Sequence, residues 1–182
     1  MHRKLLPLLS LMILLFTACV SNYEPKGVYL TDSAVFQLLP PSALPPLESY
    51  QLITGSFNGH DEMSAEAYLV IDSSKLDLTI LTPTGQTIAS VVFDGRSMDF
   101  HSPFVSARKL KSEYIIADIQ LLLSSLDILK PELEAIGLDI SEENGKRTLT
   151  SSGEVISTMT NQGGHVEVVN ALRSYTYSID LL

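Results

Sequence analysis

Hydrophobic and polar residues alternate along most of the chain from position 50 onward, which is the pattern of strands with one buried face. Short turns that contain Gly, Pro, Asn or Asp separate the alternating segments. The predicted strands cover residues 50–57, 64–72, 75–81, 86–93, 97–101, 147–151, 154–159, 165–169 and 175–181. Because such short turns join most neighbouring strands, we expect them to form an antiparallel meander.

Residues 112–129 follow a different period, with apolar side chains recurring every three or four positions. This spacing predicts an amphipathic helix, capped by Ser112 and closed by Pro131. A polar loop is expected over 137–145. The order of strands, helix and strands predicts an α+β fold: one curved, incompletely closed antiparallel sheet with the helix covering its concave face.

The longest apolar run lies between the basic residues Arg3 and Lys4 and the single cysteine of the chain, Cys19. It is shorter than the roughly 20 apolar residues that a membrane-spanning helix needs. The small residues Thr17 and Ala18 stand just before the cysteine. This layout predicts a secretory signal peptide that ends in a lipobox, where the cysteine thiol is acylated and the chain is cut before it. The alternative is an ordinary signal peptide whose cysteine is incidental.

Three segments follow from this interpretation: a signal peptide over 1–18, an acylated cysteine with a tether or arm over 19–49, and a folded domain over 50–182. Two or three acyl chains would make a stable membrane anchor. Val20 follows the cysteine, where Asp would resemble an inner-membrane retention signal. The predicted location is therefore the cell envelope, at the periplasmic leaflet of the outer membrane. Phe16 stands where a lipobox usually has Leu, Val or Ile.

The charge of the chain bears on its partners. The sequence has 12 basic and 21 acidic residues and a formal net charge of -9. Such a surface repels phosphate backbones, and no cluster of Lys and Arg reverses this, so we expect no nucleic-acid partner. A single cysteine excludes an internal disulfide and a Cys-based zinc site.

No residue spacing in the sequence predicts catalysis. There is no Gly-x-Ser-x-Gly elbow and no His-x-x-x-His pair, and Gly163-Gly164 lies between strands rather than before a helix. We therefore expect no enzyme activity, no metal and no cofactor. A curved sheet covered by an apolar helix predicts a hydrophobic pocket instead. The residues expected to line or plug it are Tyr68, Phe93, Phe100, Phe104, Ile119, Leu122, Tyr175 and Tyr177; for each ring the alternative is a plain core position.

Several stretches together resemble a known family. They are Leu81-Thr-Pro-Thr-Gly-Gln-Thr-Ile88, Val92-Phe-Asp-Gly95, Ser102-Pro-Phe104, Ile116-Ala-Asp-Ile-Gln-Leu121 and the closing Tyr175-x-Tyr177. They are similar to a family of uncharacterised Gram-negative lipoproteins that are often encoded in aryl-polyene pigment gene clusters. The resemblance covers about residues 48–182 and the lipobox. It implies an architecture related to the LolA and LolB carriers, whose unclosed barrel holds acyl chains under a helical lid, and it implies Cys19 as the acylation site.

Three functional hypotheses remain open on the sequence. The first is an outer-membrane lipoprotein that binds or transfers a hydrophobic ligand, such as an acyl chain, a lipid or an aryl-polyene intermediate. The second is a structural or adaptor lipoprotein that docks on a transporter or synthase in the envelope and has no ligand cavity. The third is a hydrolase of envelope lipids, for which the sequence shows no paired nucleophile and base.

Overall fold

The computed structural model describes residues 19–25, 27–57, 63–103 and 111–182. In this part of the chain, eleven strands form one sheet in the order β1-β8-β7-β6-β5-β4-β13-β12-β11-β10-β9, and every neighbouring pair is antiparallel. The strands are β1 (Cys19–Tyr23), β4 (Leu47–Phe57), β5 (Met63–Ile71), β6 (Leu76–Leu81), β7 (Thr87–Phe93), β8 (Met98–Ser102), β9 (Leu138–Glu143), β10 (Lys146–Ser151), β11 (Glu154–Gln162), β12 (His165–Asn170) and β13 (Tyr175–Leu181).

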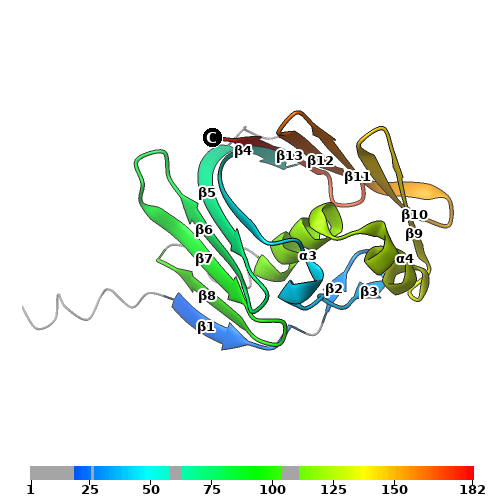
Figure 1. Cartoon of the computed structure of the whole chain (residues 1–182), viewed down its shortest axis with the longest axis horizontal. Coiled ribbons are helices and arrows are strands. Elements are labelled where there is room, and N and C mark those ends of the chain that lie inside the picture. The colour runs from blue at the N-terminus through cyan, green and yellow to red at the C-terminus, as the bar shows by residue number, and fades with distance from the viewer. Residues whose placement is uncertain (1–18, 26, 58–62, 104–110) are drawn as a thin grey trace, which may run out of the picture.

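The sheet is strongly curved and does not close on itself. Its ends are β1 and β9, and the pairing of β4 with β13 joins the N-terminal and C-terminal halves. Figure 1 shows the sheet bending around α3. The prediction of a mostly antiparallel, incompletely closed sheet combined with helical structure is confirmed, and coverage of its concave face by a helix stays a prediction.

The single predicted helix is two helices, α3 (Ser112–Leu123) and α4 (Leu126–Glu134). The break falls at Ser124 and Ser125, both of which have extended backbone. Arg147 stabilises this break, because its Nη1 donates hydrogen bonds to the carbonyl oxygens of Leu121 and Ser124 at the end of α3.

Two details of the predicted helix are wrong. Ser112 is not the N-cap but the first residue of α3, and its hydroxyl hydrogen-bonds the phenol of Tyr23. Pro131 does not close a helix, since it lies inside α4. Helix α3 has already ended before the two serines. Pro131 therefore lies within the separate short helix α4, where it removes one backbone N–H donor.

The polar loop expected over 137–145 is mostly strand β9, which corrects the prediction. Leu138 and Ile140 are buried while the residues between and after them are exposed, so β9 has a buried face two residues long. A tight turn at Asn144 and Gly145, which have φ values of 52° and 74°, joins β9 to β10. Two successive positive φ values are typical of the two-residue hairpin turns that Asn-Gly favours.

Residues 19–49, expected as a tether or arm, carry short elements where described. Besides β1, they form the small hairpin β2 (Val28–Tyr29) with β3 (Val35–Phe36), and the 3-10 turn η1 (Pro41–Ala43). Val28 and Phe36 are buried against the helices. This segment therefore contributes to the hydrophobic core; its role as a tether stays a prediction.

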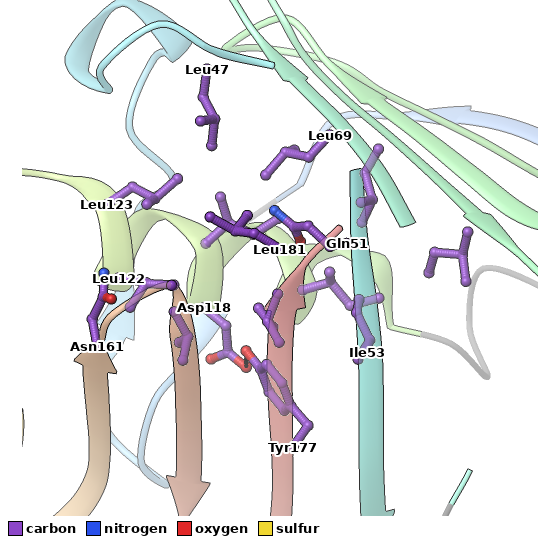
Figure 2. A pocket seen from close by; sticks show the side chains of 17 residues that line it. Leu47, Gln51, Ile53, Leu69, Asp118, Leu122, Leu123, Asn161, Tyr177 and Leu181 are labelled. Carbon is purple, nitrogen blue, oxygen red and sulfur yellow. Dashed lines mark hydrogen bonds between the residues drawn. The ribbon is translucent and has the colours of Figure 1, made fainter. Parts of the chain in front are cut away.

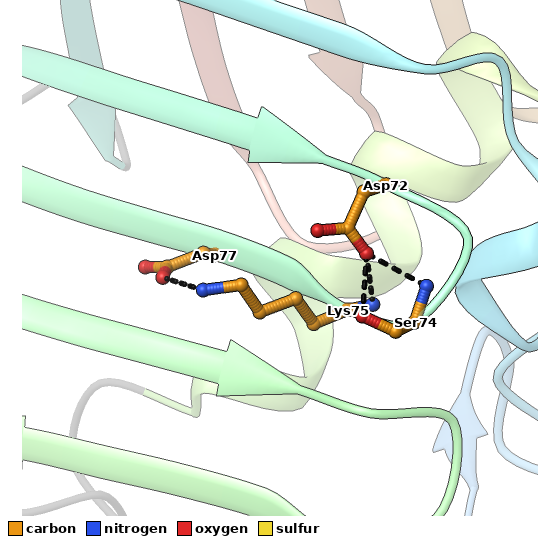
Figure 3. A network of polar contacts seen from close by, with 4 residues as sticks. All are labelled: Asp72, Ser74, Lys75 and Asp77. Carbon is orange, nitrogen blue, oxygen red and sulfur yellow. Dashed lines mark hydrogen bonds and ion pairs between the residues drawn. The ribbon is translucent and has the colours of Figure 1, made fainter.

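The turn between β5 and β6 shows how a short polar segment fixes a hairpin. Asp72 Oδ1 accepts hydrogen bonds from the backbone N–H groups of Ser74 and Lys75, at 2.7 and 2.9 Å, and from the Ser74 hydroxyl (Figure 3). The three hydrogen bonds hold the pKa of Asp72 below its usual value. Lys75 Nζ pairs with Asp77 at 2.9 Å on the same exposed surface.

The buried side chains form two clusters, and α3 contributes to both. One cluster joins β2, β3, α3, α4 and the strands of the C-terminal half, and includes Ala117 and Leu121 of α3. The other joins β5 to β8 and includes Ile116 of α3. Because α3 is anchored on both sides, its position relative to the sheet is fixed by packing.

No helix in the described part of the chain is long and apolar enough to cross a membrane.

Candidate functional site: an apolar cavity between α3 and the sheet

One face of α3 lines a cavity. The side chains on this face are those of Ile115, Asp118, Ile119, Leu122 and Leu123, which recur at three- or four-residue intervals. One wall of the cavity therefore comes from the helical stripe that the sequence pattern indicated.

The remaining walls of the cavity come from the sheet. The first half of the sheet supplies Leu47, Gln51, Ile53, Leu69, Leu78 and Ile80, and the second half supplies Asn161, Gly164, Val166, Tyr177, Ile179 and Leu181. The cavity has a volume of about 420 Å³, within the roughly 300–1,000 Å³ range of small-molecule sites. Leu181 is 60% exposed, so the cavity reaches solvent near the end of β13.

A buried amide sets the rotation of α3. Gln120 is fully buried on the face away from the cavity; its Nε2 donates to the Leu39 carbonyl and its Oε1 accepts from the Leu39 N–H, both at 2.8 Å. Both polar atoms of the amide are thus satisfied. This paired contact fixes which residues of α3 face the cavity.

Asp118 is the acidic residue among these apolar walls. Tyr175 Oη donates a hydrogen bond to Asp118 Oδ2 at 2.7 Å, and Tyr177 Oη donates to the same oxygen at 3.3 Å. Figure 2 shows the carboxyl group of Asp118 and the phenol of Tyr177 turned toward each other. The two tyrosines stand two residues apart on β13, so they share a face of the strand, and their rings stack at 6.1 Å.

Burial raises the pKa of Asp118 to about 6, despite the two tyrosine hydrogen bonds and the charge of Arg173, which act in the opposite direction. Burial, followed by the Asp118 charge, also raises the pKa values of Tyr175 and Tyr177, which keeps both phenols protonated as donors.

Arg173 lies near this cluster but is engaged elsewhere. Its guanidinium stacks over the Tyr114 ring at 4.6 Å, and its Nη1 donates to the Leu30 carbonyl at 3.5 Å. Among the described residues it forms no ion pair with Asp118. The negative charge of Asp118 is therefore only partly compensated.

The structure brings some of the predicted pocket residues together and places others elsewhere. Ile119, Leu122 and Tyr177 line the cavity. Tyr175 lies next to it, through its bond to Asp118. Phe104 lies outside the described residues.

The other three predicted rings are not in the cavity wall. Phe93 and Phe100 are each 1% exposed and belong to the hydrophobic cluster of β5 to β8, which is the plain core role. Tyr68 is 38% exposed, and its hydroxyl donates a hydrogen bond to Glu48 across the β4–β5 pair. Ligand binding by the eight predicted residues stays a prediction.

The sequence interpretation missed Asp118, although a signal was present. Asp118 is a lone acidic residue between apolar neighbours on the helical stripe, three positions after Ile115 and four before Leu122. A carboxylate at such a position requires partners from another element. The Tyr175-x-Tyr177 pair of hydroxyl donors was the available candidate.

Among the described residues there is no group of three or more His, Cys, Asp or Glu side chains placed to hold a metal ion.

Residues 48–182 match the model of the family described as "Protein of unknown function (DUF3261)". The chain belongs to this family. No curated protein matches the chain significantly. Among solved structures, it is similar to a LolA superfamily protein from Nitrosomonas europaea, with 12% sequence identity and a TM-score of 0.41, over 82% of this chain and 92% of that one.

Proposed function

We propose that this member of the DUF3261 family binds a hydrophobic ligand, such as an acyl chain, a lipid or an aryl-polyene intermediate, in the cavity between α3 and the sheet. The observation that carries the proposal is the cavity itself: about 420 Å³, walled mainly by Leu, Ile and Val side chains. Empty apolar space of this size sacrifices packing contacts that the fold could otherwise make. A bound apolar ligand would restore them.

The proposal includes the site of action. The basic n-region, the apolar run and the small residues before Cys19 support a lipoprotein whose N-terminal cysteine is acylated. Val20 after the cysteine supports the outer membrane, facing the periplasm. In this proposal α3 serves as the lid over the concave face, and the cavity opens close to a membrane that supplies or receives the ligand.

The adaptor alternative requires a concave face that is packed solid. The described cavity favours ligand binding over that alternative. The hydrolase alternative has no described constellation of nucleophile and base in the cavity wall, whose polar side chains are Gln51, Asp118, Asn161 and Tyr177.

The test is to purify the full chain from the cell envelope and to identify co-purifying lipid by mass spectrometry after denaturation. The covalently attached acyl chains stay on the protein and are thereby separated from ligand. We expect a hydrophobic compound at close to one equivalent per chain. A chain that carries no ligand and takes up none from vesicles of envelope lipid would contradict the proposal.

A further inference from the structure

The cavity has a polar end that its apolar walls do not explain. Among its described lining residues, Asp118 is the only carboxylic acid, and it lies on α3 where that helix faces β13 (Figure 2). A carboxyl group in an apolar wall costs free energy unless hydrogen bonds or charges compensate for it. Its partners therefore indicate what the site can bind.

The two oxygens of Asp118 differ in their surroundings. Oδ2 accepts hydrogen bonds from both Tyr175 and Tyr177. In the described parts of the chain no group donates a hydrogen bond to Oδ1. Ser124 Oγ is the fully buried polar side-chain atom without a partner in those parts, so Oδ1 itself is not fully buried. Because the Asp118 side chain lines the cavity, Oδ1 is left to accept a hydrogen bond from a group inside it.

The groups around Asp118 leave its acceptor role intact. Tyr175 and Tyr177 face it from β13, and Arg173 acts on it only as a charge from the β12–β13 turn. Asn170 Nδ2 donates to Tyr175 Oη at 3.2 Å, which holds that phenol in place as a donor to the carboxyl group. Arg173 and Lys111 both lie over the Tyr114 ring, and among the described lining residues of the cavity there is no Lys or Arg to receive an anionic end group.

We propose that Asp118 binds the polar end of the ligand, and that this end is a hydroxyl or amino group that donates a hydrogen bond to Oδ1, while carboxylate, sulfonate and phosphate ends are disfavoured. This inference rests on the proposed function and specifies its ligand class: a single-chain amphiphile with a neutral or cationic donor end. A donor at this end gains a hydrogen bond to a charged acceptor, whereas an anion beside Asp118 meets like-charge repulsion at low dielectric.

The test uses the full chain in its own membranes and a photoreactive dodecanol that carries a diazirine and an alkyne in its chain. Unlabelled dodecylamine, dodecanol and dodecanesulfonate, which share a chain length, compete for labelling at pH 8. The matched variant is Asp118→Asn, which keeps the shape of the side chain and removes its charge. Comparing the two proteins in the same membranes cancels the different partitioning of the three competitors.

For each protein, the potency of a competitor is expressed relative to that of dodecanol. We expect the relative potency of dodecanesulfonate to be about tenfold lower in wild type than in Asp118→Asn. Dodecylamine should shift about tenfold in the opposite direction. Equal shifts for all three competitors, or stronger competition by the sulfonate in wild type, would overturn the assignment. If labelled peptides do not map to α3 or β13, the proposed function itself fails, which is a distinguishable result.

A second measurement needs no variant, in case Asp118→Asn does not fold. Sulfonate stays anionic between pH 5 and pH 8, so its competition in wild type reports the charge on Asp118. Because burial raises the pKa of Asp118 to about 6, exclusion of the sulfonate should relax at pH 5. Competition by dodecanesulfonate that does not change relative to dodecanol over this range would contradict the inference.

Discussion

At the scale of single residues, Asp118 links the charge of the cavity to the stability of the fold. Its folded-state pKa of about 6 lies above the ordinary value of 3.8 because burial disfavours the carboxylate. Folding therefore strengthens proton binding at this group. Its contribution to stability is full below the ordinary pKa and is lost as the pH rises through about 6.

The Asp118→Asn variant isolates this contribution. Between pH 4 and pH 8 we expect the free energy of unfolding of the variant, relative to wild type, to rise by about 2–3 kcal/mol, because only wild type pays for ionisation in the cavity. Urea unfolding of both proteins at several pH values measures the difference. Parallel curves across this pH range would show that Asp118 ionises as readily in the folded chain as in the unfolded one.

The sequence pattern indicated which face of α3 is apolar, whereas ligand binding by any residue on that face stays a prediction. Ile119 and Leu122 lie on the helical stripe, and both line the cavity. The sequence could not distinguish Phe93 and Phe100 from rings that face a ligand. A strand pattern shows which side chains are buried, but it does not show whether a helix or an empty space lies opposite them. In the structure both rings are packed in the core of β5 to β8.

At the scale of elements, the β9–β10 hairpin depends on a glycine that has no room for a side chain. Gly145 has φ of +74°, and a Cβ built there would lie 2.9 Å from the carbonyl oxygen of Asn161. Gly153, in the turn between β10 and β11, has φ of +84° and nothing within 4 Å of such a Cβ. The two positions therefore separate backbone strain from steric conflict.

We expect Gly145→Ala to lower the free energy of unfolding by about 2–3 kcal/mol and the matched Gly153→Ala to lower it by about 1 kcal/mol. The larger effect includes displacement of the Asn161 carbonyl. That movement also disturbs the backbone hydrogen bond that the Asn161 N–H donates to the Gly145 oxygen at 2.9 Å. Chemical denaturation of the two variants compares them. Equal losses would mean that the Asn161 backbone moves aside at no cost.

The same hairpin shows why the sequence prediction of elements was incomplete. Nine of the strands were predicted from alternation and turn residues, but β9 has only two buried positions, Leu138 and Ile140, before its exposed end. Its best signal was the turn, Asn144-Gly145, and not its hydrophobic pattern. The split of the long helix at Ser124 and Ser125 was hidden because apolar positions continue on both sides of the break.

At the scale of the whole molecule, the cavity exists because the two hydrophobic clusters meet α3 at different places on the helix. Ala117 and Leu121 pack with one cluster and Ile116 with the other, while Ile119 and Leu122 are only partly buried against these clusters and also line the cavity. Sequence patterns predicted the sheet and the helix. The gap between them depends on the curvature of the sheet and the rotation of α3, which long-range contacts such as Gln120 with Leu39 set.

Membrane attachment is tested separately from ligand binding. We expect metabolic labelling with an alkyne-tagged fatty acid to label the full chain, and Cys19→Ser to lose essentially all of the label, because the thiol is the acceptor. Thr17→Ser, which keeps a small residue before the cysteine, should keep the label. Full labelling of Cys19→Ser would place the modification elsewhere or show that the cysteine is incidental.

The most direct test of the central claim fills the cavity. Leu122→Trp puts an indole into the apolar space, and Leu172→Trp puts one on a leucine that is 51% exposed and lies outside the cavity wall. Both variants are purified as full chains, checked for cooperative thermal unfolding and compared for co-purifying lipid by mass spectrometry. We predict that lipid falls at least about tenfold in Leu122→Trp and is unchanged in Leu172→Trp. Equal lipid in two folded variants would contradict the assignment of the cavity as the binding site.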